Sequence, residues 1–493
     1  MDYSKLLNRR DVSRPLYVQL QKSLTDAIES GHLPAGTRLP SERNLAGKLS
    51  LSRTTVVNAY RELESFGLVR SQVGRGTFVC AVPEPDDAPF AWRGKVSARV
   101  EKVGSKPSLR QLMNGDSGES CISFVAGTPA FECFPLEEYR GAMSQTLKRY
   151  PRLALGIGPT EGQPDLRRAI ARRFGTKPER ILILSGSQQG IDLIARCLID
   201  HGDSIILDRP GYVGAIQTFR AAGANVVGWD ALRADLDELE DLIVRYRPKF
   251  VYTDPTFQNP TGRTMSLKER QDLLKLAARY RIPVIEDDPW RDTYFHTQPP
   301  LSLYQLDVHN IVIHLGTFSK VLAPGLRLGW LAASEFIVDQ LASIKQHENL
   351  FNEGLTQIVI ADFLQSGLFD SHLENLRSEH IKRRDAMKRA AEKHLAPRTC
   401  VLNNPQGGLH FWCRLMKGID ARHLLDVAVQ EGVAFAPGEL FYPDEAGGGQ
   451  ELRLCFSSVR VDRIEEGIKR LRSAFDTLES NKPTNGSFHT LLL

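Results

Sequence analysis

Apolar and polar residues near the start of the chain follow the spacing of three short helices and a hairpin. Pro15 precedes the first helix, and Gly31 ends it. The apolar stripe of this helix is predicted to consist of Leu16, Leu20, Leu24, Ala27 and Ile28. Ser41 and Ser52 are placed to cap a second and a third helix, because a serine oxygen accepts a hydrogen bond from a free N–H of the first turn.

The third helix is predicted to end at Gly67 and to be followed by two strands. Its apolar stripe is predicted to consist of Val56, Ala59, Tyr60, Leu63 and Phe66. The strands cover residues 68–70 and 77–79, and they flank a glycine turn at 72–76. Together these elements predict a helix-turn-helix with a β wing over residues 1–80.

The remainder of the chain predicts a linker followed by an α/β domain. Residues 81–117 begin with a proline-rich run, carry a basic stretch and lack periodicity, which is typical of an extended linker. Residues 118–479 alternate short β-rich runs with amphipathic helices, which predicts a largely parallel sheet. Within this domain, a smaller α+β lobe is expected at about 385–478. The tail, 480–493, is predicted to be disordered.

Composition agrees with a globular protein of more than one folding unit. A chain of 493 residues exceeds the size of a single core, and its 42% hydrophobic and 25% charged residues are ordinary values. The seven cysteines form no CxxC pair and show no metal-ligand spacing, so we expect reduced thiols and no metal site. An apolar signal segment and a membrane-length apolar run are both lacking, which predicts a cytoplasmic location.

The positive charge is concentrated at one end of the chain. Residues 1–80 hold 12 Lys and Arg against 7 Asp and Glu, whereas the rest of the chain holds 51 against 52. A basic segment on a nearly neutral protein suggests a polyanionic partner, with an ordinary solvated face as the alternative.

The start of the third helix is the predicted DNA-reading element. An α-helix fits the major groove, and residues at its N-terminal end reach bases and phosphates most easily. Arg43 is expected to approach the backbone, and the wing tip at Gly74 and Arg75 is expected to enter near the minor groove. The alternative is a trihelical protein-interaction domain. The candidates on the third helix are Ser52, Arg53, Thr54 and Thr55.

The motifs of residues 11–80 resemble the GntR-type winged helix. The resemblance lies in the segments 15–17, 36–43, 52–55 and 74–77, which read PLY, GTRLPSER, SRTT and GRGT. It implies a phosphate-backbone contact at Arg43, the start of the recognition helix at Ser52 and the wing glycine at Gly74. Val57 stands where some members carry an arginine, so base preference is not transferred.

The second domain carries a series of candidate ligand groups after its predicted strands. The run 185–190 ends a strand and opens a helix, so the N–H groups around Gly186, Ser187 and Gln188 are suited to cradle a phosphate. Tyr212 follows the next strand, where it can cover an aromatic ring. Asn259 lies in the turn QNPTG, although an Asn-Pro pair is more often only a turn.

Two charged residues follow further strands. Asp287 ends an apolar run, so its carboxylate is expected at a strand end, with a helix cap as the alternative. Lys320 follows another buried strand in the run TFSK, which indicates a desolvated amine. Arg453 of the small lobe is placed to pair with a substrate carboxylate. Three further residues are suited to a phosphate, namely Thr317, Ser319 and Arg327.

Pyridoxal phosphate (PLP) needs this set of groups: a lysine, an acid at the pyridine nitrogen, a donor to the ring hydroxyl, an aromatic wall and a phosphate site. The order of these motifs over residues 118–478 resembles fold-type I aminotransferases, especially their kynurenine/2-aminoadipate branch. The resemblance implies a PLP-linked lysine at Lys320, the pyridine-nitrogen contact at Asp287, ring contacts at Asn259 and Tyr212, and a carboxylate clamp at Arg453. It implies phosphate contacts from Gly186, Ser187, Gln188, Thr317, Ser319 and Arg327.

Two positions depart from that aminotransferase pattern. Ile157 stands where the family has a tyrosine that reaches the phosphate from the partner subunit. Trp290 stands where another tyrosine bonds the ring hydroxyl, and an indole donates a hydrogen bond but does not ionise. Weaker cofactor retention or weaker catalysis is therefore our hypothesis.

The two resemblances in one chain point to the MocR-type subgroup of GntR-family regulators. They imply a PLP-dependent DNA-binding regulator, a head-to-tail homodimer, and an effector that is an amine, an amino acid or PLP itself. One alternative is a working aminotransferase with an accessory DNA-binding domain. A structural or interaction module with an inactive pocket is the other.

Overall fold

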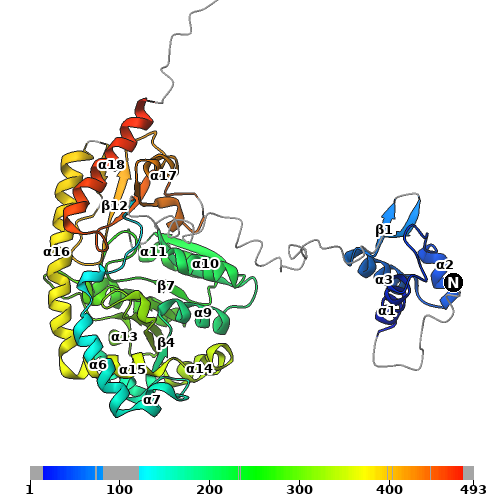
Figure 1. Cartoon of the computed structure of the whole chain (residues 1–493), viewed down its shortest axis with the longest axis horizontal. Helices are drawn as coiled ribbons and strands as arrows, with labels where there is room; N and C mark the ends of the chain where they lie inside the picture. Colours follow the sequence, from blue (N-terminus) through cyan, green and yellow to red (C-terminus); the bar gives the residue numbers. More distant parts are fainter. Residues whose placement is uncertain are drawn as a thin grey trace, which may run out of the picture. The chain divides into compact units, whose positions relative to one another are not determined.

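The computed structural model of the chain describes residues 15–72, 75–80, 121–230, 232–233, 235–396, 398–401, 403–444 and 446–480. The predicted linker 81–117 and the wing residue Gly74 lie outside these ranges. So does the predicted tail 480–493, except for Ser480, which is the last residue of α18. The chain divides into two compact units, with the division after Val96. Figure 1 shows the small N-terminal unit and the large unit, which are described separately below.

The N-terminal unit has the predicted elements in the predicted order. They are α1 (Leu16–Glu29), α2 (Glu42–Leu49), α3 (Arg53–Ser65), β1 (Val69–Gln72) and β2 (Gly76–Val79). β1 and β2 form an antiparallel pair with Val69 opposite Val79. The oxygen of Ser41 accepts a bond from the N–H of Asn44, and that of Ser52 accepts from Thr55. Both predicted N-caps are confirmed.

The core of this unit is built from the apolar faces of its helices. Leu20, Leu24, Val56 and Leu63 are fully buried in it. Phe66, which we expected to continue the stripe of α3, is instead the C-cap residue of that helix and is 54% exposed. The chain leaves the helix at this residue, so the side chain of Phe66 does not reach the core.

The large unit alternates strands and helices, as the sequence predicts. Its helices are α6 (Leu136–Arg149), α7 (Pro151–Leu155), α8 (Pro164–Phe174), α9 (Ser187–Leu198), α10 (Val213–Ala221), α11 (Leu236–Tyr246), α12 (Leu267–Tyr280), α13 (Leu303–Leu306), α14 (Glu335–Asn349), α15 (Gly354–Ser366), α16 (Leu368–His394), α17 (Ala421–Gln430) and α18 (Val461–Ser480). Its short 3₁₀ turns are η3 (Phe131–Cys133), η4 (Pro178–Arg180), η5 (Arg291–Thr293), η6 (Pro324–Leu326) and η7 (Gly438–Phe441).

A seven-stranded sheet forms the centre of the large unit. Its members are β4 (Ile181–Leu184), β5 (Ser204–Arg209), β6 (Asn225–Asp230), β7 (Val251–Thr253), β8 (Val284–Asp287), β9 (Val312–Thr317) and β10 (Gly329–Ala332). The spatial order is β4-β10-β9-β8-β7-β5-β6. β5 to β9 run parallel, whereas β10 is antiparallel to both of its neighbours. The sheet is therefore mixed and largely parallel.

Side chains alternate between the two faces of this sheet, and each face is covered by its own helices. On one face, Ile285 of β8 and Leu315 of β9 pack with α9, α10 and α14. On the other, Ile183 packs with α6, α8 and α15, and Val284 packs with α11, α12 and α13. The side chain of Asp287 therefore lies on the first face and that of Glu286 on the second. For this reason the two carboxylates contact different residues.

The smaller α+β lobe is also present. Its sheet runs β11-β12-β15-β14, from β11 (Thr399–Val401), β12 (His410–Leu415), β14 (Ala436–Pro437) and β15 (Glu451–Cys455). A separate pair joins β3 (Ile122–Ser123) to β13 (Val433–Ala434) in parallel. The long helix α16 packs against α18 and runs along the whole large unit (Figure 1). Among the described residues, no helix is both long enough and apolar enough to cross a membrane.

We predict that Leu24→Ala destabilises the N-terminal unit by about 2–5 kcal/mol, because Leu24 is fully buried and its removal leaves a cavity. Hydrogen exchange of α1 and α3, followed by mass spectrometry on the full chain, measures the effect. Leu16→Ala on the same helix is the control, since Leu16 is 42% exposed. Equal protection in the two variants would contradict the assignment of the core.

Candidate functional site

The carboxylate of Asp287 lies buried at the end of β8. Its Oδ2 accepts a hydrogen bond from the hydroxyl of Tyr252, which lies on the adjacent strand β7. Its Oδ1 has no partner among the described residues. Burial raises the pKa of Asp287 to about 6, although the bond from Tyr252 acts in the opposite direction. The free oxygen can therefore accept one further hydrogen bond from a ligand.

Lys320 lies in the turn that follows β9. Its Nζ donates to the carbonyl oxygen of Gly127 at 2.7 Å and lies 5.2 Å from the ring centre of Trp290. Burial lowers the pKa of Lys320 to about 8, with a further lowering by the charge of Arg453. At a pKa of about 8, roughly a tenth of this amine is uncharged at pH 7, far more than in an exposed lysine, and the uncharged form is the one that attacks a carbonyl.

The run after β4 forms a cradle of backbone N–H groups. Gly186 has φ +90°, a conformation suited to glycine, and α9 begins at the next residue, Ser187. Arg327 lies beside this turn, because a Cβ on Gly186 would come within 3.1 Å of its guanidinium group. Arg327 also donates to the carbonyl oxygen of Ser185 at 2.8 Å. A helix N-terminus and an arginine meeting at one point can bind an anion.

The other two candidate anion ligands lie in the turn before Lys320. The backbone N–H of Ser319 donates to the Oγ1 of Thr317 at 3.2 Å, which links the two residues. Ser319 is buried, and Thr317 is half-buried at the end of β9.

Tyr212 is joined to the same cradle through Gln188. The hydroxyl of Tyr212 donates to Oε1 of Gln188 at 3.1 Å, and Nε2 of Gln188 donates to Thr218 on α10 at 2.9 Å. Burial raises the pKa of Tyr212 to about 12, so this hydroxyl stays protonated.

Asn259 is held from both sides. Its backbone N–H donates to Oδ2 of Asp254 at 2.9 Å, and its side-chain oxygen accepts from Arg453 at 2.7 Å. Arg453 also donates to the carbonyl oxygen of Val125, and its Nε has no partner among the described residues. Because Asn259 uses its oxygen for Arg453, its amide N–H₂ group remains a donor for a ligand.

The two departures from the aminotransferase pattern differ in location. Trp290 is buried against Gly127, and its indole Nε1 has no partner in the described part of the chain. His410 lies edge-on to this ring, with 5.8 Å between ring centres. Ile157 is 90% exposed and contributes nothing to the site within one chain.

The candidate DNA-contacting residues gather at the start of α3 and near the wing. Ser52, Arg53, Thr54, Arg43 and Arg75 are all exposed. Arg53 forms an ion pair with Glu42 at 3.3 Å, with 72% of the arginine side chain exposed. Thr55 is half-buried, and its hydroxyl bonds to that of Ser52.

Four residues of the large-unit site were missed from the sequence. Gly127, Tyr252, Asp254 and His410 contact Lys320, Asp287, Asn259 and Trp290, respectively. Tyr252 and Asp254 could have been identified from the sequence, because a hydroxyl and a carboxylate at the end of an apolar strand need hydrogen-bond partners. Gly127 acts through its backbone carbonyl oxygen. Because every residue has this group, the sequence gives no signal for it.

We predict that Asp287→Asn stabilises the protein freed of PLP by about 1–3 kcal/mol at pH 7. The pKa of Asp287 in the folded protein, about 6, lies above the ordinary value of 3.8, so ionisation costs stability as the pH rises from about 4 to 6. The gain should be absent below pH 4 and constant above pH 6. Calorimetric unfolding across this range measures it, and exposed Asp426→Asn is the control. A pH-independent gain would contradict the assignment.

We also predict that Lys320 titrates near pH 8 in the PLP-free protein, about two pH units below an exposed lysine. Competitive acetylation with limiting acetic anhydride, read by peptide mass spectrometry, should show half-maximal labelling of Lys320 near pH 8. Exposed Lys268 serves as the internal reference. Half-maximal labelling of Lys320 above pH 10 would contradict this prediction.

Comparison with known proteins gives a match for each unit. The family "Bacterial regulatory proteins, gntR family" matches residues 16–79, and the family "Aminotransferase class I and II" matches residues 120–471. The chain is 36% identical to a 2-aminoadipate transaminase of Thermus thermophilus over 79% of this chain and 98% of the relative. It is 30% identical to the probable rhizopine catabolism regulatory protein MocR of Rhizobium meliloti over 96% of both chains.

A solved structure agrees with the large unit. It is the alpha-aminoadipate aminotransferase of Thermus thermophilus complexed with N-(5'-phosphopyridoxyl)-L-leucine, with a TM-score of 0.75 and 34% identity. The match covers 79% of this chain and all of that one. The transaminase match covers 79% of this chain, whereas the regulator match covers 96% of it. The chain therefore belongs to the MocR-type gntR-family regulators, in which a class I and II aminotransferase domain follows a helix-turn-helix unit.

Proposed function

We propose that this protein is a PLP-dependent, DNA-binding transcription regulator whose aminotransferase-like domain senses an amine, an amino acid or PLP. The observation that carries the proposal is the presence of both units in one chain that aligns with a regulator over 96% of its length. We place the DNA-binding domain at 1–80, a basic linker at 81–117, and the effector domain at 118–479.

The residues of the large-unit site fit PLP. When bound, PLP supplies an aldehyde that reacts with amines and an electron-withdrawing pyridine ring. We assign Lys320 as its covalent ligand and Asp287 as the partner of the pyridine nitrogen, because the buried, unpaired Oδ1 of Asp287 needs a donor. The cradle at Gly186, Ser187 and Gln188 would hold the phosphate.

The remaining assignments complete the cofactor site. Thr317, Ser319 and Arg327 would join the phosphate cradle, and Tyr212 would cover the ring. Asn259 would donate to the ring hydroxyl from its free amide group. Trp290 would donate to the same oxygen from its indole, whose Nε1 has no partner in the described structure.

We propose a carboxylate-bearing amine as the effector. Arg453 supports this class, because its buried guanidinium group is held near Asn259 and retains an unpaired Nε. A carboxylate can replace the bond to Asn259 and thereby link effector binding to the cofactor site.

We propose a head-to-tail homodimer as the active form. Ile157, Leu155 and Leu153 are 90%, 75% and 54% exposed, and side chains of this kind are normally covered in an assembly. A second copy would bury this surface and bring Ile157 towards its partner's site.

The experiment that tests the function is DNase footprinting of genomic fragments with purified protein, with and without PLP. We expect a discrete protected site, with PLP or an added amine changing its affinity or extent. Arg53→Ala should weaken binding by about tenfold, because a specific arginine–base contact contributes about 1–3 kcal/mol. Arg61→Ala is the control, since Arg61 is exposed on the same helix further from its start.

Lys320→Ala separates the sensor from a DNA-binding protein with an unused pocket. We expect this variant to bind DNA and to lose both the response to PLP and the absorbance of bound cofactor. Sequence-independent binding, or a response to PLP that persists in Lys320→Ala, would overturn the proposal.

An aminotransferase with an accessory DNA-binding domain is the second candidate. It is favoured by the 36% identity to a transaminase and by the groups around Lys320. Turnover of amino and 2-oxo acids at rates typical of enzymes, together with no specific footprint, would establish it.

A further inference from the structure

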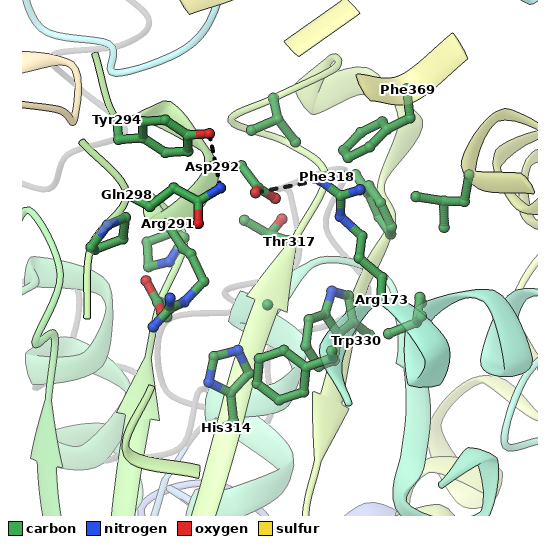
Figure 2. A pocket seen from close by; sticks show the side chains of 18 of the residues that line it. Arg173, Arg291, Asp292, Tyr294, Gln298, His314, Thr317, Phe318, Trp330 and Phe369 are labelled. Atoms are coloured by element: carbon green, nitrogen blue, oxygen red, sulfur yellow. Dashed lines mark hydrogen bonds and ion pairs between the residues drawn. The ribbon is translucent and has the colours of Figure 1, made fainter. Parts of the chain in front are cut away.

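A second cavity lies in the large unit, on the opposite side of the strand ends from Lys320. It has a volume of about 550 Å³, which is within the range of small-molecule sites. Its walls come from α8, η5, α13, β9, β10, α15 and α16. Figure 2 shows His314 and Trp330 at one end of it, with Arg173 and Asp292 paired beside Thr317.

Alternating side chains place this cavity back to back with the candidate cofactor site. Asp288 lines the cavity, whereas the preceding Asp287 points to the Lys320 side and bonds to Tyr252. The turn after β9 also contributes to both sites. Phe318 lines the cavity together with Thr317 and Val321, whereas Lys320 reaches to Gly127. A molecule in the cavity would therefore contact the turn that carries Lys320.

The arginine side chains that line the cavity all have partners, whereas some carboxylate oxygens have none among the described residues. Three arginines and four acids line it. Arg291 donates to Oδ2 of Asp288 and to the carbonyl oxygen of Pro300, both at 2.8 Å. Arg173 bonds to Asp370 at 2.6 Å.

The third arginine is engaged as well. Arg377 donates to the backbone carbonyl of Asp292 at 3.0 Å and stacks on Tyr294, 3.8 Å from the ring centre. Each arginine therefore already has a partner, so an anionic ligand would have to displace one of them.

Oδ1 of Asp288 is a hydrogen-bond acceptor without a partner among the described residues. The side chain of Asp288 is fully buried, and its Oδ2 is bonded to Arg291. A buried carboxylate oxygen without a donor is costly, and a ligand N–H group would satisfy it. Glu374 on α16 lines the same cavity and has no ion pair within the described part of the chain.

Aromatic rings also line this cavity, and His314 among them lies close to Asp288. The rings of Phe174, His314 and Trp330 pack together, with centres 4.4 to 5.0 Å apart. Aromatic rings beside a carboxylate with one free oxygen suit a flat organic cation, because ring faces attract positive charge and the free oxygen accepts an N–H bond.

We propose that this cavity is a second, non-covalent ligand site for a small organic cation with N–H donors, which bonds to Asp288 and stacks on the aromatic rings of the cavity. The site goes beyond the proposed function and does not depend on it, because neither Lys320 nor PLP takes part in binding. Since the turn at 317–321 borders both sites, occupancy of the cavity should alter the affinity for PLP, and PLP should alter the affinity of the cavity by the same factor.

The test uses benzamidine, a planar cation that donates N–H bonds and, unlike a primary amine, forms no imine with PLP. Isothermal titration of the full-length protein should give one site per chain with a Kd at or below about 1 mM. Phenyltrimethylammonium has the same charge and a similar size but no N–H group, and it should bind about tenfold more weakly. Benzoate should not bind to the cavity.

Variants locate the site. Asp288→Asn should weaken benzamidine binding by about tenfold or more, because its amide keeps an acceptor for Arg291 but loses the charge. Glu374→Gln, at an exposed position where folding is not at risk, should weaken binding by about two- to threefold. Glu392→Gln removes the same charge from α16 outside the cavity and should leave binding unchanged.

Lys320→Ala should retain benzamidine binding, which separates this cavity from the cofactor site. Three results would each overturn the proposal: no saturable binding up to about 10 mM, equal affinity of the wild type and of both the Asp288 and Glu374 variants, or loss of binding in Lys320→Ala. If Asp288→Asn does not fold, the comparison of benzamidine affinity between Glu374→Gln and Glu392→Gln tests the proposal without it.

Discussion

A carboxylate or an amine placed out of water must find partners, and in this protein the strand ends supply them. Asp287 is buried with only one of its oxygens bonded, and burial shifts the pKa values of both Asp287 and Lys320 towards neutrality. Neither shift favours the stability of the empty protein. The strands β8 and β9 fix the positions of Asp287 and Lys320. These two side chains therefore stay oriented towards a ligand and do not relax towards each other.

Strand alternation gives these ends a second property. Neighbouring residues of one strand face opposite sides of the sheet, so a single turn can border two sites. Asp287 and Asp288 show this directly, since the first bonds to Tyr252 and the second to Arg291. In the turn after β9, Phe318 lines the cavity, whereas Lys320 reaches to Gly127. A change in either site therefore has a short covalent path to the other.

Features with a local cause could be predicted from the sequence. The serine caps of α2 and α3 and the wing strands depend on residues within one or two turns, and all of them are present. The positions of Asp287 and Lys320 at or just after strand ends follow from the short apolar runs that precede them. Phe66 shows the limit, because apolar spacing alone did not mark where α3 stops packing.

Contacts between distant segments could not be predicted in the same way. Arg453 and Asn259 are 194 positions apart, and Lys320 meets Gly127 across 193 positions. Such pairs depend on how segments distant in the sequence pack together, which no local pattern encodes. The cavity at Asp288 was missed for the same reason, since its walls come from seven separate elements. The family resemblance supplied roles for single residues, but it did not supply these partners.

Several buried polar atoms that lack partners among the described residues lie where a ligand is expected. Asp287 Oδ1, Trp290 Nε1 and Arg453 Nε are buried without partners in the described structure, and each lies at the candidate cofactor site. A ligand that bonds to all three binds the folded form and not the unfolded chain, so it stabilises the large unit in proportion to its concentration. The same bonds can distinguish two conformations of that unit only if they differ between them. The bond from Arg453 to Asn259 joins the small lobe to the turn after β7, and it is the bond that the proposed carboxylate effector would replace.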